Sequence, residues 1–186
     1  MFNIRYVEDD ETMVPWTHYR FNDRPVLLAM NNPQSVLPEH ALYPHPEGVA
    51  GHRLYEMLRD SAAEQGLPVS RVNYLERFDR RNLLNALQWN TAEAYRRAGV
   101  VLEAVRGRNV IVLGVRTLRA LRLSRPGGSS TWGRWRRVDR LDLNYCLLPH
   151  PSGRCREYND PDMRRKTGDL LLKLYRYNPQ QVILEE

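Results

Sequence analysis

The chain has few cysteines, few lysines and no long apolar run. Its 186 residues include two cysteines, Cys146 and Cys155, too few for a four-cysteine zinc site or an iron–sulfur cluster. Two cysteines also make no disulfide framework, which favours a reducing compartment. The opening residues MFNIRYVEDDETMVP contain no apolar signal core, and no segment approaches membrane-spanning length. We therefore expect a cytoplasmic, nucleoid-associated or nuclear protein that is neither secreted nor bound to membranes.

Positive charge is plentiful, but lysine supplies little of it. Of 28 basic residues only Lys166 and Lys173 are lysines, and the formal net charge is +6. The arginine guanidinium suits bidentate phosphate contacts and base stacking better than the lysine ammonium does. An arginine-rich basic domain favours a polyanionic partner, most often nucleic acid, and a basic surface that serves only solubility is an equal alternative. The length predicts a single domain over residues 1–186.

Short apolar runs alternate with helical patterns along the chain. Strands are expected at residues 25–30, 69–76, 109–114 and 141–153, the last ending in a turn. Helices are expected at residues 52–66, 80–107, 115–123 and 160–177. Strands separated by helices indicate an α/β fold with a central, mostly parallel four-stranded sheet.

Two segments stand outside this alternation. Residues 1–23 are mixed in character, with Trp16, Tyr19 and Phe21 as the expected packing anchors. Residues 33–51 form a proline-rich loop that is longer than an ordinary connection, and long loops in compact domains are often functional.

Polar residues follow several of the expected strands. In parallel sheets ligands bind outside the carboxyl ends of the strands. This rule places NNPQS (31–35), Asn73, Gly114 and HPSG (150–153) along one edge. The ends of the first and fourth strands are therefore predicted to face one crevice.

The side chains at this edge form a hydrogen-bonding set rather than a nucleophile–base triad. The chain has no G-x-S-x-G nucleophile elbow and no glycine-rich P-loop. The spacing of His40, His45 and His52 matches no zinc signature, so we expect exposed loop histidines and neither metal nor cofactor. Such a site acts electrostatically, by stabilising a leaving anion and orienting a water molecule.

The order of these motifs resembles that of the uracil-DNA glycosylase superfamily. In that family the first motif ends strand one as G-x-[D/N]-P-G or a close variant, and the last is H-P-S followed by a basic loop. This sequence has MNNPQ at 30–34 and HPSG at 150–153 in those places. The elements between them also look similar over residues 24–176: YPHPEGVAGHRLYEML, RVNYLE and NVIVLGVRTLRAL.

The resemblance implies a three-layer αβα sandwich and a metal-independent DNA glycosylase. Such an enzyme flips a nucleotide out of DNA and hydrolyses its N-glycosidic bond, leaving an abasic site. The motif style is closest to the mismatch-specific and single-strand-selective classes, which implies uracil or a 5-substituted uracil such as 5-hydroxymethyluracil or mismatched thymine. The implied partner is single- or double-stranded DNA, bound by a monomer.

The first motif departs from the family pattern. If Asn32 before Pro33 is the catalytic position, both family glycines are replaced, by Met30 and Gln34. A second alignment puts Asn31 at that position. We prefer Asn32, because the residue before a proline is held extended and its side chain is thereby fixed.

The resemblance also implies catalytic roles. His150 would donate a hydrogen bond to O2 of the departing base, and Asn32, or Asn31 in the second alignment, would position the attacking water or the sugar. The structural alternatives are a turn histidine and a strand-end asparagine that satisfies its own turn.

Three further residues would contact the flipped base. Asn73 would read the pyrimidine edge, because a carboxamide offers both a donor and an acceptor. Tyr43 would stack on the base, and Met30 would lie against it. The alternatives are a solvent-facing asparagine and a tyrosine packed on the core.

DNA contacts are expected in two basic segments. They are Ser152, Gly153, Arg154 and Arg156 after the last strand, and Arg134, Arg136 and Arg137 in the glycine-rich loop or hairpin 126–137. The first segment would grip a phosphate and insert a side chain into the gap left by flipping. In the second, tryptophans between arginines suit unstacked bases.

Two other hypotheses compete with a glycosylase. One is a non-catalytic member of the fold that binds DNA, a modified base or a nucleotide, which the lost glycines favour. The other is an unrelated nucleotide hydrolase on a flavodoxin-like sheet, which would be expected to carry a carboxylate cluster at the strand ends.

Overall fold

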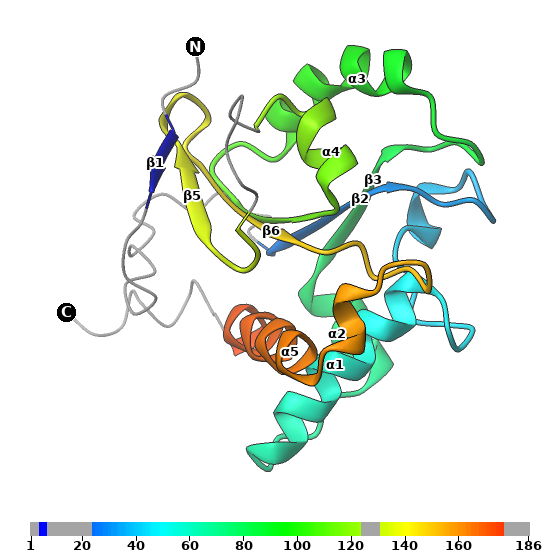
Figure 1. Cartoon of the computed structure of the whole chain (residues 1–186), viewed down its shortest axis with the longest axis vertical. Helices are drawn as coiled ribbons and strands as arrows, with labels where there is room; N and C mark the ends of the chain where they lie inside the picture. The colour runs from blue at the N-terminus through cyan, green and yellow to red at the C-terminus, as the bar shows by residue number, and fades with distance from the viewer. Residues whose placement is uncertain (1–3, 7–23, 124–130, 177–186) are drawn as a thin grey trace.

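A computed structural model describes residues 4–6, 24–123 and 131–176 of the chain. Its elements form one mixed sheet with helices on both faces (Figure 1). The expected anchors Trp16, Tyr19 and Phe21 lie outside the described residues.

The sheet has six strands in the order β1-β5-β6-β4-β2-β3. They are β1 (Ile4–Tyr6), β2 (Val26–Asn31), β3 (Asp79–Leu84), β4 (Asn109–Leu113), β5 (Trp135–Val138) and β6 (Leu143–Leu148). Strands β6, β4, β2 and β3 are parallel to one another, whereas β5 and β1 are antiparallel additions beyond β6. The α/β class and the mostly parallel sheet are confirmed, and the expected number of four strands is wrong.

Two layers of helices cover the sheet. The helices are α1 (Ala50–Glu64), α2 (Arg71–Arg77), α3 (Thr91–Ala104), α4 (Val115–Ala120) and α5 (Pro161–Arg176), with short 3₁₀ turns at η1 (Pro38–His40), η2 (Asp139–Leu141) and η3 (Glu157–Asn159). Figure 1 shows α3 and α4 on one face, and α1, α2 and α5 on the other.

The alternation of side chains along β2 divides the apolar core in two. Val26 and Leu28 pack in the cluster that includes residues of α3 and α4. Leu27 and Ala29 pack in the cluster that includes residues of α1, α2 and α5. Successive strand residues point to opposite faces, so a continuous apolar run such as β2 can be buried on both sides only in a layered fold of this kind.

Residues 69–76, expected to be a strand, contain the helix α2 instead. The Ser70 side chain accepts a hydrogen bond from the Asn73 backbone N–H at 3.1 Å, and Asn73 Oδ1 accepts one from the Ser70 backbone N–H at 3.0 Å. This reciprocal capping box satisfies two backbone donors at the start of a helix. The local capping outweighs the strand-like alternation of V-S-R-V-N-Y.

The expected helix over 80–107 is wrong in its first part, which is strand β3. The charged residues that open β3 find partners there: Asp79 lies 2.7 Å from Arg108 Nη1 and 2.8 Å from Arg81 Nη2. Burial works to raise the pKa of Asp79, but hydrogen bonds from Arg81 and Arg108 outweigh it and lower that pKa. Because this pairing is made in the tertiary structure, an edge strand can begin with charges that look like a solvated helix face.

Helices α1 and α5 meet at a glycine. A Cβ atom added to Gly168 would lie 2.3 Å from the Met57 carbonyl oxygen and 2.3 Å from Ser61 Oγ. Real Cβ contacts are not that short, so the two helix backbones can approach this closely only because residue 168 has no side chain.

We expect Gly168→Ala to lower the free energy of unfolding by about 1–3 kcal/mol, the usual cost of overpacking a close contact. The matched control is Gly99→Ala in α3, where an added Cβ would have nothing within 4 Å. Since alanine is a better helix former, Gly99→Ala should raise that free energy by about 0.5–1 kcal/mol. Urea unfolding followed by circular dichroism measures both changes, and a stabilised Gly168→Ala variant would contradict the packing described.

Candidate active site

The order of the parallel strands creates a switch point in the sheet. From β2 the chain moves outward to β3, then returns across β2 to β4 and continues to β6. In open α/β sheets ligands bind beyond the carboxyl ends of the strands where this direction reverses. The reversal lies between β2, which runs into the polar loop that begins at Asn32, and β4, which Gly114 joins directly to α4.

A pocket of about 480 Å³ opens at this edge. Its walls come from the end of β2, the loop 33–49, the start of α1, the middle of β3 and the turn after β6. The lining residues are Ala29, Asn31, Asn32, Pro33, Gln34, Ser35, His40, Leu42, Tyr43, His45, Pro46, Gly48, Val49, Ala50, Gly51, Asn82, His150, Ser152 and Gly153.

Several residues expected to share a site do line this pocket. They are Asn31, Asn32, Tyr43, His150, Ser152 and Gly153. The strand ends NNPQS and HPSG, far apart in the sequence, therefore contribute to one cavity.

Asn73 and Met30 do not line the pocket. The Asn73 carboxamide belongs to the capping box of α2, where its Oδ1 also accepts a hydrogen bond from Ser70 Oγ at 2.8 Å. Met30 lies between Ala29 and Asn31 on β2, so strand alternation turns its side chain toward the opposite face. Neither residue is in place to contact a base held in this pocket.

The expected basic residues divide into two groups. Arg154 and Arg156 are exposed and follow the pocket residues Ser152 and Gly153 directly in the chain. The other three, Arg134, Arg136 and Arg137, lie in or beside β5, which is separated from β2 by β6 and β4.

Of those three arginines, one is buried and another is ion-paired. Arg136 is buried within β5. Arg137 forms ion pairs with Asp139 and Asp142 in the turn that follows the strand. The cluster of tryptophan and arginine therefore helps to form the antiparallel edge of the sheet.

Both ends of the Asn32 carboxamide are occupied within its own loop. Its Oδ1 accepts a hydrogen bond from the Gln34 backbone N–H at 2.9 Å, and its Nδ2 donates to the His40 carbonyl at 3.2 Å. An asparagine that bonds the backbone two residues ahead forms an Asx turn. Asn32 thus shapes the loop, and these two bonds take up one lone pair of its Oδ1 and one of its two amide hydrogens.

The Asn31 side chain, unlike that of Asn32, forms hydrogen bonds within the described residues through its amide nitrogen alone. Its Nδ2 donates to the carbonyl oxygens of Ala86 and Leu87, at 3.0 and 3.1 Å. Two carbonyl acceptors use both amide hydrogens and fix which end of the carboxamide carries the nitrogen. Its Oδ1 accepts no hydrogen bond within the described part of the chain, and the residue lines the pocket.

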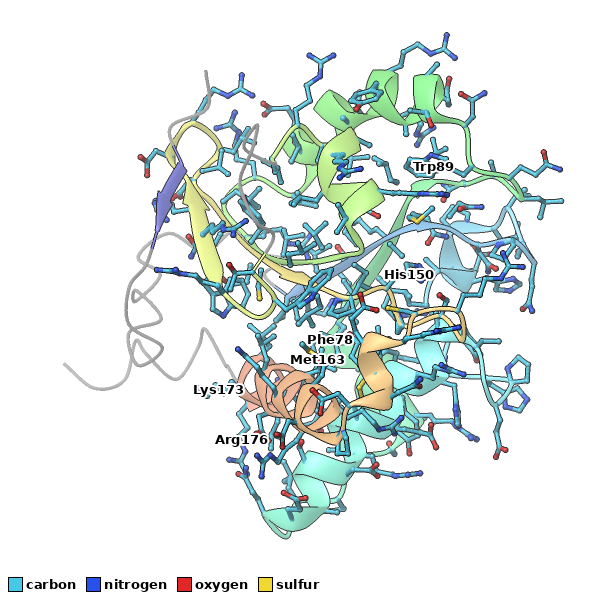
Figure 2. The ribbon with its side chains drawn as sticks, in the orientation of Figure 1. Phe78, Trp89, His150, Met163, Lys173 and Arg176 are labelled. Carbon is cyan, nitrogen blue, oxygen red and sulfur yellow. The ribbon has the colours of Figure 1, made fainter. Side chains whose placement is uncertain are left out.

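His150 reaches the pocket by passing over a glycine. A Cβ atom at Gly114, the residue after β4, would lie 3.1 Å from His150 Cβ, and Gly114 has φ +89°. The Gly114 N–H donates to the Leu148 carbonyl at 2.8 Å, which ties the turn to the end of β4. Figure 2 labels His150 just beyond the end of β6.

The His150 imidazole is largely buried and makes no side-chain hydrogen bond to another described residue. Burial lowers its pKa from the ordinary value of 6.5. The ring is therefore neutral at neutral pH and keeps one N–H that can donate and one nitrogen that can accept.

Asn82, which no sequence motif singles out, lies on β3 in the pocket wall. It is paired with Ala29 of β2 and only 8% exposed. Its Nδ2 is buried without a hydrogen-bond partner among the described residues. A buried amide nitrogen without a hydrogen-bond partner is uncommon in folded proteins. The sequence pattern predicts a helix over 80–107, so it does not bring Asn82 to the strand ends, whereas β3 does.

The loop that carries Tyr43 is fastened to the body of the protein by three contacts. Tyr74 Oη donates to the Leu42 carbonyl at 3.2 Å, and Arg80 Nη1 donates to the Ala41 carbonyl at 2.8 Å. Gly51 lets the loop backbone lie against α1, because a Cβ there would be 2.1 Å from the Leu42 oxygen. These contacts hold the Tyr43 ring at the pocket, half in solvent.

The electrostatic character of the pocket suits an anion. None of the described residues that line it is an aspartate or a glutamate. Val49, Ala50 and Gly51 at the start of α1 contribute to the wall, and the N-terminus of a helix carries partial positive charge. The pocket therefore combines neutral donors with a favourable dipole.

Comparison with protein-family models and with curated proteins finds no match to this chain in either set. Among the described residues, no helix has both the length and the apolar character needed to span a bilayer.

The lowered pKa of His150 predicts a pH-dependent stability. As the pH falls below about 6.5, the unfolded chain takes up a proton at this position before the folded protein does. The free energy of unfolding should therefore decrease through this range, because protonation favours the unfolded state. His150→Gln lacks this proton uptake, so wild type should lose stability relative to the variant between pH 7.5 and 5. Urea unfolding of both proteins over this range checks the sign, and a constant difference between them would contradict it.

Proposed function

We propose that the protein is a DNA glycosylase that hydrolyses the N-glycosidic bond of uracil or a 5-substituted uracil, such as 5-hydroxymethyluracil or mismatched thymine. The observation that carries the proposal is the meeting, in one pocket, of a neutral His150 donor and the fixed carboxamide oxygen of Asn31. This pair supplies the two functions that the reaction needs, stabilisation of a leaving anion and orientation of water.

The substrate must enter the pocket as a single extruded nucleotide, because its glycosidic bond is hidden within the duplex. A cavity of about 480 Å³ lies within the usual range for sites that hold one small ligand. Arg154 and Arg156, which are exposed and follow Gly153 of the pocket wall, would meet the phosphates of the flanking nucleotides. Ser152 and the backbone around Gly153 would grip the nearest one.

Cleavage breaks the bond between C1′ of the sugar and N1 of the base, and its electron pair leaves with the base. An N–H of the neutral His150 imidazole donates a hydrogen bond to O2, where negative charge develops. The N-terminus of α1 adds favourable partial charge on the same wall. Because these groups are held in place before the reaction, they need no reorganisation as charge appears.

The attacking water adds its oxygen to C1′, and the proton that it releases is taken up by the departing base anion. Asn31 Oδ1 accepts a hydrogen bond from this water and so orients it, since the two carbonyl contacts at Nδ2 fix the carboxamide. An amide is a weak base, so its contribution is positioning rather than proton abstraction. Asn32 acts one step further out, by shaping the loop that forms the pocket wall.

Recognition of the base falls to Asn82 and Tyr43. The Asn82 carboxamide offers a donor and an acceptor to the edge of a pyrimidine. Tyr43 offers an aromatic face on which the base can stack. In this proposal Asn82 takes the role that the sequence resemblance implies for Asn73.

A non-catalytic protein that binds DNA, a modified base or a nucleotide is the second candidate. The observation that favours it is the absence of a carboxylate from the described pocket wall, which leaves no strong base to take the proton of water. Such a protein would use the same pocket to hold an extruded base without hydrolysis.

The activity test uses labelled oligonucleotides that contain uracil, a thymine mismatch or 5-hydroxymethyluracil, incubated with EDTA and then treated with alkali to cleave abasic sites. We expect strand breaks from the wild type. His150→Ala should reduce the single-turnover rate by about 10²–10³-fold, the usual effect of removing one preorganised donor. Asn31→Ala should also lower this rate strongly.

The control is Asn73→Ala, which removes a carboxamide outside the pocket and should leave the rate within a few-fold of wild type. Equal loss in Asn73→Ala and Asn31→Ala would contradict the assignment of the site. Binding to these oligonucleotides without any abasic product would favour the second candidate, and no DNA affinity at low salt would exclude both.

A separate prediction concerns Asn82. Replacement by leucine removes a buried amide that lacks a partner, so Asn82→Leu should raise the free energy of unfolding by about 1 kcal/mol. The same change should lower kcat/KM for the uracil-containing oligonucleotide by roughly tenfold or more, because the base loses its hydrogen bonds to Asn82.

Asn109→Leu is the matched control: Asn109 Oδ1 is likewise buried without a partner among the described residues, and this residue does not line the pocket. It should gain stability and keep its activity, and a loss of stability in Asn82→Leu would show a structural role instead.

A further inference from the structure

The mouth of the pocket carries two exposed apolar side chains that the catalytic proposal does not use. Gln34 and Ser35 line the pocket, and the next two residues, Val36 and Leu37, point into solvent with 50% and 46% of their surface exposed. Leu87, 52% exposed, stands on the segment that Asn31 binds through its amide. Val36 and Leu37 therefore continue the chain from the pocket wall, and the Leu87 backbone is bound by a pocket residue.

The loop that presents Val36 and Leu37 is held rigidly by short polar contacts. Ser35 Oγ accepts a hydrogen bond from the Leu37 N–H at 3.1 Å and lies 2.9 Å from His40 Nδ1. Asn32 closes the same loop through its bonds to Gln34 and His40. Two apolar side chains are thus kept in solvent by a preorganised scaffold, although burial would be more favourable for them.

The basic residues that adjoin the same pocket favour a nucleic acid as the partner. Arg154 and Arg156 follow the pocket residues Ser152 and Gly153, and both are exposed. They form no ion pair within the described part of the chain, so their charge is available to phosphates. In a complex with DNA, the apolar side chains of Val36 and Leu37 suit contact with stacked bases, and the guanidinium groups of Arg154 and Arg156 suit contact with the flanking phosphates.

Resting on the proposed function, we propose that Val36 and Leu37 form the wedge that enters the duplex and fills the gap left by the flipped nucleotide. Extruding a base costs a few kcal/mol of stacking and pairing. Apolar side chains inserted at a base step recover part of that cost, since they contact the exposed faces of neighbouring bases. The wedge then comes from the loop after β2, and Arg154 and Arg156 act on phosphates rather than in the stack.

A wedge acts only where there is a stack to enter, so its effect must depend on the duplex. The probe is an oligonucleotide with one tetrahydrofuran abasic analogue, which has a gap but no base to hydrolyse. Its affinity is measured as a duplex and as a single strand, with 2-aminopurine beside the gap to report stacking. The test variant is Val36→Ser/Leu37→Ser, in which both apolar side chains become small and polar.

We expect the double variant to bind the gapped duplex about tenfold more weakly than the wild type and to lose the fluorescence change beside the gap. Its affinity for the single strand should stay within about twofold. The matched control is Val72→Ser/Val100→Ser, which changes two valines that are 59% and 71% exposed on α2 and α3 and do not line the pocket. This control should bind both probes as the wild type does.

Equal weakening on duplex and single strand, or no weakening on either, would overturn the wedge. A double variant with unchanged DNA binding but altered self-association would identify the rim as a protein contact and overturn it as well. Because the probe cannot be hydrolysed, a selective loss on gapped duplex supports the wedge even if no uracil substrate is cleaved. Uracil cleavage by a double variant with unchanged gap binding would support the glycosylase alone.

Discussion

The close passage of His150 over Gly114 is the contact on which the rest of the site depends. Strand β6 is separated from β2 by β4, so a residue that follows β6 reaches the end of β2 only by crossing the end of β4. A side chain at position 114 would meet His150 Cβ at 3.1 Å, and the positive φ of this residue excludes most side chains on backbone grounds as well. Gly114 therefore allows the segments that follow β2 and β6, which are far apart in the sequence, to line the same pocket.

Two polar groups at the pocket have environments that lower the stability of the protein. Asn82 keeps a buried amide without a partner among the described residues, and His150 is a buried imidazole that resists protonation. Groups of this kind lower the stability of the empty protein and are found mainly where binding or catalysis uses them. Asn31 differs because both hydrogens of its Nδ2 are bonded. These bonds orient the carboxamide and leave its Oδ1 without a partner among the described residues.

Two separate sets of contacts hold the two halves of the loop between β2 and α1. Tyr74, Arg80 and Gly51 fasten the part of the loop that ends at Tyr43, whereas Asn32 and Ser35 fasten the part that precedes it. The contacts go mostly to backbone groups, so the shape of the loop depends little on the exposed side chains it carries. Side chains at the rim are thus free to meet a partner without disturbing the wall behind them.

The sequence alone determined the parts of this protein that local patterns control. Apolar runs such as 109–113 and 143–148 form buried strands because their length and composition permit little else, and the parallel order then brings their carboxyl ends to one edge. The tertiary structure decided which polar residue does what. Asn31 and Asn32 are chemically identical neighbours that differ only in their hydrogen-bond partners. The carbonyl groups of Ala86 and Leu87 bind the Asn31 amide nitrogen and leave its oxygen without a partner among the described residues, whereas Asn32 binds the His40 carbonyl and closes its own turn. Asn82 likewise lies in the pocket wall because β3 pairs with β2, a long-range interaction that no local sequence pattern encodes.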